Sequence, residues 1–304
     1  MSRIAIAGST GLVGDALARD LESQGHRLVR LVRDENHRPR SASGKPSDEF
    51  ASWNPSGNRI APGALDGCDA VVNLAGEPIS QRWTDSVKTR IVESRVRSTR
   101  LLAGECARLR IPVLVNASAI GIYGDRKDDI LEECSPSGGG FLADTCVAWE
   151  HASRPAREAG TRTVSCRFGV ILARKGGALP RMLPAFRVGL GGPIGTGNQW
   201  MSWIHLSDAV RVVEHALFED SVSGAVLATS PRPVRQSEFA TVLAHRLHRP
   251  ALFRLPAWTV RLIFGRMADE LLLGSQRCHP RRLEETGFRW AFPDLDQALR
   301  DLVG

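Results

Sequence analysis

The chain has 304 residues, of which 42% are hydrophobic and 24% are charged. This length suits one large α/β domain, alone or with a small module, and the composition excludes disordered, collagen-like and coiled-coil classes. The formal net charge is +7, from 40 Lys and Arg against 33 Asp and Glu. The basic residues are scattered and form no long run, so we expect no nucleic-acid partner.

The six cysteines form no C-x-x-C pair, and no cluster of acidic, His and Cys residues has metal-ligand spacing. Reduced, buried thiols and no metal site are therefore expected. The first residues lack the apolar core and cleavage site of a signal peptide, and no stretch reaches the roughly 20 apolar residues that span a bilayer. We expect a cytoplasmic protein without a membrane partner.

The first half of the chain alternates short apolar runs with helical spacing. Strands are predicted over residues 4–7, 28–32, 70–74, 113–116 and 163–167, and helices over residues 12–24, 85–109 and 143–158. Residues 34–58 are polar and rich in Ser, Pro and Arg, which favours an exposed loop. The alternation predicts an α/β fold, a Rossmann doubly wound parallel sheet.

The spacing becomes irregular after Gly169, and a glycine-rich stretch follows at residues 189–195. We expect the substrate-facing segments to begin at about residue 170. An amphipathic helix is predicted around residues 239–247, and residues 261–304 indicate a small helical cap. We therefore divide the chain into a Rossmann domain, residues 1–235, and a small C-terminal helical module, residues 236–304.

The strongest motif lies between the first predicted strand and the first helix. It is a G-x-x-G-x-x-G sequence composed of Gly8, Ser9, Thr10, Gly11, Leu12, Val13 and Gly14. Glycines let the backbone approach a pyrophosphate, whose charge is met by free N–H groups and the positive end of the helix dipole. An ordinary tight turn needs one glycine rather than three, so we predict a dinucleotide site here.

The end of the second strand bears on the choice of cofactor. NAD enzymes place an acidic residue there, against the ribose diol, whereas NADP enzymes place an arginine near the 2′-phosphate. This chain has Arg33 followed by Asp34. Because a guanidinium pairs with a phosphate through two hydrogen bonds, Arg33 favours NADP, while Asp34 leaves NAD open.

Two later strands end in residues suited to ligand contact. The strand ending at Asn73 continues into Leu74, Ala75 and Gly76, small enough for the backbone to pass close to an adenine or ribose. Ser118 closes a later strand at the carboxyl edge of the sheet, where open α/β folds bind ligands. Ser118 is thus placed to hydrogen-bond a reacting carbonyl.

These motifs, together with Ile122-Tyr123-Gly124, resemble the extended short-chain dehydrogenase/reductase superfamily. The chain looks most like an atypical branch of sugar-nucleotide epimerase-like proteins, some of which are labelled cell-division inhibitors. Residues 72–79, 189–193, 199–205 and 271–277 carry this likeness, which runs nearly end to end.

The resemblance implies an NADP-binding Rossmann fold, a small-molecule substrate and a cofactor site to which several further residues contribute. Val32 and Arg33 would lie by the adenosine phosphate and Leu74 and Ala75 beside the cofactor, with Arg90, Ser94 and Arg95 reaching it from the following helix. Members of the superfamily often form dimers, so a homodimer stays open.

The catalytic pair of the superfamily, Tyr-x-x-x-Lys, is absent from its usual helix. If Glu150 takes the superfamily's glutamate position, Leu142 and Cys146 occupy the tyrosine and lysine places. Tyr123 is the only tyrosine and lies just beyond Ser118, in a predicted loop. One hypothesis is that Tyr123 donates a proton alone. His205 fits a structural role better than the alternative, a substrate contact. We expect Ser207 or Asp208 to cap the next helix.

Two functions follow from these observations. The first is an NADP-dependent oxidoreductase or epimerase of the short-chain type, acting on a substrate with a hydroxyl or carbonyl group. The second is a dinucleotide-binding regulatory or scaffold protein that has lost catalysis, which the missing tyrosine and lysine favour.

Overall fold

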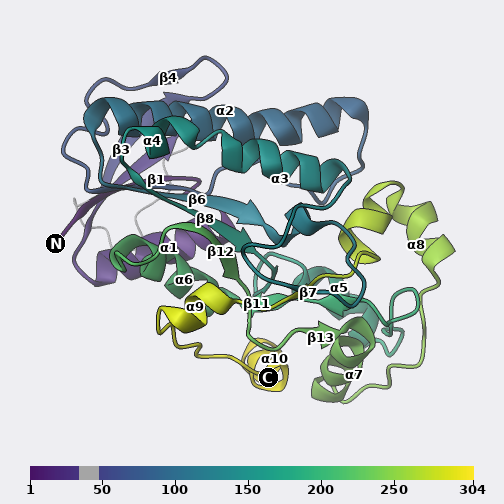
Figure 1. Ribbon diagram of the computed structural model, residues 1–304. Coiled ribbons are helices and arrows are strands. Elements are labelled where there is room, and N and C mark those ends of the chain that lie inside the picture. The colour runs from purple at the N-terminus through teal and green to yellow at the C-terminus, as the bar shows by residue number, and fades with distance from the viewer. Residues whose placement is uncertain (34–47) are drawn as a thin grey trace.

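The computed structural model describes residues 1–33 and 48–304, and its centre is one eight-stranded sheet (Figure 1). The strand order is β12-β8-β6-β5-β1-β2-β3-β4, parallel except for the antiparallel pair β3 and β4. Their bounds are β1 Arg3–Ala7, β2 Arg27–Val32, β3 Asp48–Asn54, β4 Arg59–Ile60, β5 Ala70–Asn73, β6 Val113–Ala119, β8 Arg162–Phe168 and β12 Gly224–Ala228. The predicted doubly wound sheet is confirmed.

Helices cover both faces of the sheet (Figure 1). Helices α1 (Leu12–Ser23) and α6 (Leu206–Phe218) pack on one face, and α2 (Asp85–Leu109), α3 (Phe141–His151) and α4 (Arg154–Glu158) lie on the other. Strand β1 shows why: Ile4 and Ile6 enter the core under α1 and α6, whereas Ala5 and Ala7 enter the core under α2. Side chains alternate along a strand, so a strand covered on both faces is apolar throughout.

The structure differs from the sequence prediction in two elements. The helix predicted over residues 143–158 is two helices, because the chain leaves α3 at His151 and restarts with Pro155 in the first turn of α4, a position that proline favours. The loop predicted over residues 34–58 is wrong for residues 48–54, which form β3. Ala51 and Trp53 are buried on that strand, a period of two that the surrounding polar residues concealed. Residues 34–47 lie outside the described part.

The C-terminal half forms a second core beside the carboxyl edge of the sheet. Helices α5 (Leu179–Arg187), α7 (Gln236–Arg246) and α10 (Leu295–Val303) enclose Trp203 and Phe239. The remaining elements are η2 Ile120–Tyr123, β7 Ile130–Leu131, β9 Val170–Leu172, β10 Trp200–Met201, β11 Trp203–His205, β13 Val234–Arg235, α8 Ala257–Phe264, the π-helix η3 Ala268–Leu272, β14 Arg277–Cys278 and α9 Arg281–Glu285. Among the helices of the described residues, none combines the length and apolar character that crossing a bilayer requires.

Candidate functional site

The glycine motif forms a tight turn at the carboxyl edge of the sheet. Gly8 has a φ of +81°, and a Cβ atom there would lie 2.7 Å from the carbonyl carbon of Leu74. A Cβ atom at Gly14 would overlap the Gly8 carbonyl oxygen. Both positions therefore exclude a side chain: Gly8 because of its left-handed backbone and the neighbouring strand, Gly14 because α1 begins so close to the turn.

The turn leaves the first amides of α1 open to a ligand. Gly11 is the N-cap residue, it donates its own amide to the Gly8 carbonyl at 2.9 Å, and it offers no side chain to cap the helix. Ser9 is 2% exposed, and its hydroxyl has no hydrogen-bond partner among the described residues. A buried hydroxyl beside uncapped helix amides suits an anionic ligand. The turn therefore fits the diphosphate of a dinucleotide.

The loop after β5 lies against the glycine turn and is held there by hydrogen bonds. The amide of Leu74 donates to the Ala7 carbonyl at 2.9 Å, and that of Ala75 donates to the Asn73 side chain at 3.2 Å. Asn73 is fully buried and donates its amide nitrogen to Thr99 and to the side-chain oxygen of Asn116. This buried polar network fixes the ends of β5 and β6 relative to α2.

The three α2 residues implied by the resemblance all contact the loop after β5. Arg95 donates to the Glu77 carbonyl at 2.9 Å, and its guanidinium carbon lies 3.2 Å from where a Cβ atom of residue 76 would stand. The Ser94 hydroxyl accepts the Glu77 amide at 3.0 Å, and Arg90 lies 3.9 Å from the Glu77 carboxylate. In this structure these residues shape the loop, and only Arg90 exposes most of its side chain.

At the end of β2, Val32 is buried and Arg33 is exposed. Strands β1 and β2 are parallel neighbours, with Ala7 opposite Leu31. Arg33 therefore follows β2 at the same edge of the sheet as the glycine turn, where the predicted ribose and phosphate would lie. Asp34 falls outside the described residues.

Ser118 belongs to a buried ionic network. Its hydroxyl donates to Glu150 on α3 at 2.6 Å, and Arg167 on β8 binds both oxygens of that carboxylate at 2.8 Å. Ser118 and Arg167 are less than a tenth exposed. The Ser118 hydroxyl thus donates its one proton to Glu150. It can donate to a substrate carbonyl only if the hydrogen bond to Glu150 breaks.

Tyr123 has no exposed surface, and its hydroxyl lies in the same network. It donates to the Glu132 carbonyl at 2.9 Å and accepts from Arg167 at 2.7 Å. Burial raises the pKa of Tyr123, although Arg167 opposes that shift. A proton donor over the nicotinamide needs an accessible hydroxyl, so this geometry does not support the proton-donor hypothesis for Tyr123.

The two positions that replace the catalytic pair lie one helical turn apart on α3. A Cβ atom at Gly121, just beyond β6, would touch the Leu142 side chain at 3.4 Å, so Leu142 does stand at the carboxyl edge. Cys146 is buried, and burial raises the pKa of its thiol to about 11. Near neutral pH neither side chain exchanges a proton.

The structure corrects one capping prediction. His205 itself caps α6, because its Nδ1 atom accepts the amide of Ser207 at 3.2 Å. Its Nε2 atom faces the carboxylate of Asp301 at 3.4 Å, and burial lowers the pKa of the ring. His205 is a structural residue in this setting. Within the described ranges, no group of His, Cys, Asp and Glu could hold a metal ion.

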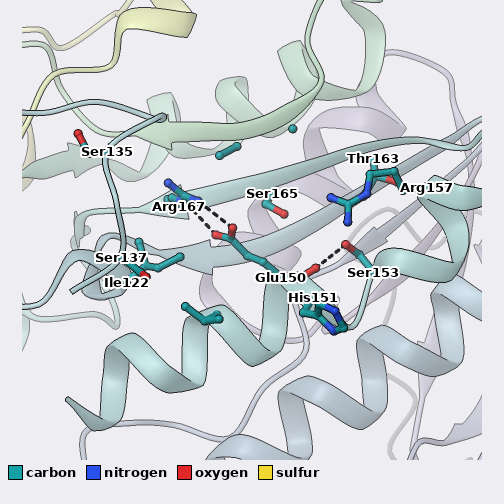
Figure 2. Close-up of a pocket in the computed structure, with 13 residues that line it drawn as sticks. Ile122, Ser135, Ser137, Glu150, His151, Ser153, Arg157, Thr163, Ser165 and Arg167 are labelled. Carbon is teal, nitrogen blue, oxygen red and sulfur yellow. Dashed lines mark hydrogen bonds and ion pairs between the residues drawn. The ribbon is translucent and has the colours of Figure 1, made fainter. Parts of the chain in front are cut away.

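A polar groove of about 460 Å³ lies behind Glu150, between α3, α4 and the β8–β12 edge (Figure 2). Arg167 and Glu150 form its inner wall, and Arg157 and His151 lie at its outer side. The turn and loops that fit a dinucleotide do not line it. Sequence reasoning did not find the Glu150–Arg167 pair. The available signal was Arg167, a charged residue that follows the buried Val164 and Cys166 on β8.

The fold, the three-glycine turn and the uncapped start of α1 define a Rossmann-type protein whose glycine turn, at the carboxyl edge of the sheet, is suited to a dinucleotide. The NAD dependent epimerase/dehydratase family matches residues 4–226, and a domain of unknown function, DUF1731, matches residues 255–302. The chain belongs to that epimerase/dehydratase family.

Similar proteins span nearly the whole chain. An epimerase family protein of Mycobacterium tuberculosis is 42% identical over 97% of this chain and 96% of its own length. The human epimerase family protein SDR39U1 is 34% identical over 99% of both chains. Its crystal structure with NADPH superimposes with a TM-score of 0.88 at 33% identity, covering 99% of each chain. A nucleoside-diphosphate sugar epimerase from Corynebacterium glutamicum has a TM-score of 0.80 at 36% identity, covering 99% of this chain and 58% of that one.

Proposed function

We propose that this protein binds NADP(H) at the carboxyl edge of its sheet and transfers a hydride between the nicotinamide and a substrate bearing a hydroxyl or carbonyl group. The observation that carries the proposal is the glycine turn, where Gly8 and Gly14 let strand, turn and helix pack closely and Gly11 leaves the start of α1 without a side-chain cap. Beside it lies the Ser9 hydroxyl, which has no hydrogen-bond partner among the residues that the structure describes. The structure of human SDR39U1 with NADPH supports the choice of cofactor.

Each part of the candidate cofactor site contacts a different part of the dinucleotide in this proposal. The first amides of α1 bind the diphosphate, as helix N-termini bind anions. Arg33 pairs with the 2′-phosphate, and Leu74 and Ala75 pack beside the adenosine half. The bound cofactor supplies or accepts the hydride. The fold positions it and excludes water.

The proton that accompanies the hydride does not come from the superfamily's usual pair. Leu142 and Cys146 cannot supply it, and Tyr123 is enclosed. These three side chains favour a second candidate function, in which the protein binds NADP(H) and does not turn it over.

Purified protein distinguishes these functions. We expect NADPH to raise the melting temperature, and we expect oxidation of NADPH with at least one compound of a broad carbonyl panel. Binding without turnover across the panel would establish the second function. A melting temperature that neither NADPH nor NADH changes would refute both.

A further inference from the structure

Segment 249–266 carries an exposed apolar surface that is not part of the proposed cofactor site. Eleven large apolar side chains are exposed in the described part of the chain, and five of them fall within twelve residues. They are Leu252, Phe253, Trp258, Leu262 and Ile263. Large exposed apolar groups gathered in this way mark an interaction site rather than ordinary surface.

Helix α8 shows that this exposure follows from the placement of the helix. Val260 is its one fully buried side chain, and about 200° of helical rotation separate it from both Trp258 and Leu262. Trp258 and Leu262, 67% and 78% exposed, therefore form an outward ridge. In Figure 1, α8 stands at the outer end of the C-terminal half.

The segment is fastened to the body of the protein on its inner side. Phe264 packs with the buried Met267 against the apolar cluster around Trp83 and Leu142. The carboxylate of Glu270 accepts the amide of Leu142 at 2.7 Å. Because this inner side is anchored, the outward ridge of α8 is a fixed surface and not the result of fraying.

The charge of the segment favours an anionic partner. Residues 239–268 contain no Asp or Glu, whereas residues 249–266 contain four arginines. These four, Arg249, Arg254, Arg261 and Arg266, are all exposed, and Arg261 pairs with Asp269 at 2.9 Å. Interfacial helices combine such a basic border with Trp, Leu and Phe on the surface that enters the lipid.

We propose that residues 249–266 dock this protein on an anionic membrane surface, with Trp258 and Leu262 inserted at the headgroup level. Indole rings favour that level, and each arginine near an anionic surface strengthens binding. The expectation of no membrane partner rested on the absence of a long apolar span, and an interfacial helix needs no such span.

The test is sedimentation with vesicles of phosphatidylglycerol and phosphatidylcholine in equal parts, compared with vesicles of phosphatidylcholine alone. We expect binding to the first kind only, with loss of binding when salt rises from about 0.1 M to about 1 M and the Debye length falls from about 10 to about 3 Å. Trp258→Gln/Leu262→Gln should weaken binding more than about tenfold. Arg254→Gln/Arg266→Gln should weaken it by about fivefold for each arginine.

Matched controls are Ile130→Gln for the apolar pair and Arg27→Gln/Arg59→Gln for the basic pair, since all three residues are exposed outside the segment. The controls should bind vesicles as the wild type does, and circular dichroism checks the fold of every variant. Equal binding to both kinds of vesicle, to neither, or by the Trp258→Gln/Leu262→Gln protein at wild-type strength overturns the proposal. Light scattering gives a further test. A dimeric wild type together with a monomeric Trp258→Gln/Leu262→Gln protein would also overturn the proposal, because a second copy of the chain would then cover the surface.

Discussion

At the scale of single residues, the network around Arg167 separates structure from catalysis. Tyr123 stands where a proton donor was expected, yet both of its hydrogen bonds go to protein groups. Tyr123→Phe should lower the free energy of unfolding by about 1–2 kcal/mol, because Arg167 and the Glu132 carbonyl each lose a partner. NADPH affinity should not change. Chemical denaturation and NADPH titration measure the two effects. A variant with wild-type stability and impaired turnover would restore the proton-donor role.

Glu150 is the residue on which the network depends. Its side chain and that of Arg167 are 18% and 10% exposed, so Glu150→Gln leaves a nearly buried guanidinium without its counter-charge. We expect a loss of about 3 kcal/mol in the free energy of unfolding. The control is Glu158→Gln, which removes an exposed partner of Arg154 and should cost at most about 1 kcal/mol. Equal losses in urea denaturation would show that the buried pair is not needed.

At the scale of secondary-structure elements, the start of α3 depends on η3, which lies far along the chain. Gly140 is its N-cap residue and has no side chain, and Glu270 of η3 accepts the amides of Phe141 and Leu142 instead. Glu270→Gln keeps an acceptor but removes the negative charge that favours a helix N-terminus. We expect Glu270→Gln to cost about 0.5 kcal/mol and Glu270→Ala about 1 kcal/mol or more. Thermal unfolding should rank the two in that order, and the reverse order would contradict the capping role.

The packing of α1 on α6 should make stability depend on pH. Burial and a hydrogen bond shared with Asp20 raise the pKa of Glu214 from 4.5 to about 7. The folded protein therefore keeps a proton that the unfolded chain releases, and the free energy of unfolding falls as pH rises from 4.5 to 7. Glu214→Gln should be more stable than the wild type above pH 7, by about 1 kcal/mol after allowance for its partial exposure.

Urea denaturation of the Glu214→Gln protein at acid and alkaline pH measures this difference. The advantage over the wild type should vanish once the pH is well below 4.5, where the wild-type carboxyl is protonated in both states. Glu238→Gln, an exposed change on α7, should show no such dependence. An advantage of Glu214→Gln that is equal at both pH values would exclude the carboxyl as its source.

At the scale of the whole molecule, the sequence predicts the sheet well because its strands are buried on both faces. Apolar runs such as residues 4–7 and 70–73 have no other stable placement, and helix α2 has the bounds that its spacing predicts. Strand β3 escaped prediction because, among its residues 49–54, only Ala51 and Trp53 are buried, within a polar context.

The candidate site divides in the same way. The glycine turn is local, so its sequence reveals its chemistry. The Glu150–Arg167 pair, the Glu270 cap and the enclosure of Tyr123 join residues from distant segments. Such contacts depend on how α3, β8 and η3 pack together, and no spacing in the sequence encodes that packing.

We expect a dinucleotide phosphate to rest on the glycine turn, with Arg33 at the 2′-phosphate. Titration of the folded protein with NADPH and with NADH, in the wild type and in Arg33→Ala, tests it most directly. We expect NADPH to bind more tightly than NADH. Arg33→Ala should weaken the binding of NADPH by about tenfold or more and leave the affinity for NADH unchanged. Arg27→Ala, at the opposite end of β2, should change neither affinity. No binding of either nucleotide, or equal NADPH affinity in the wild type and Arg33→Ala, would contradict this placement of the dinucleotide.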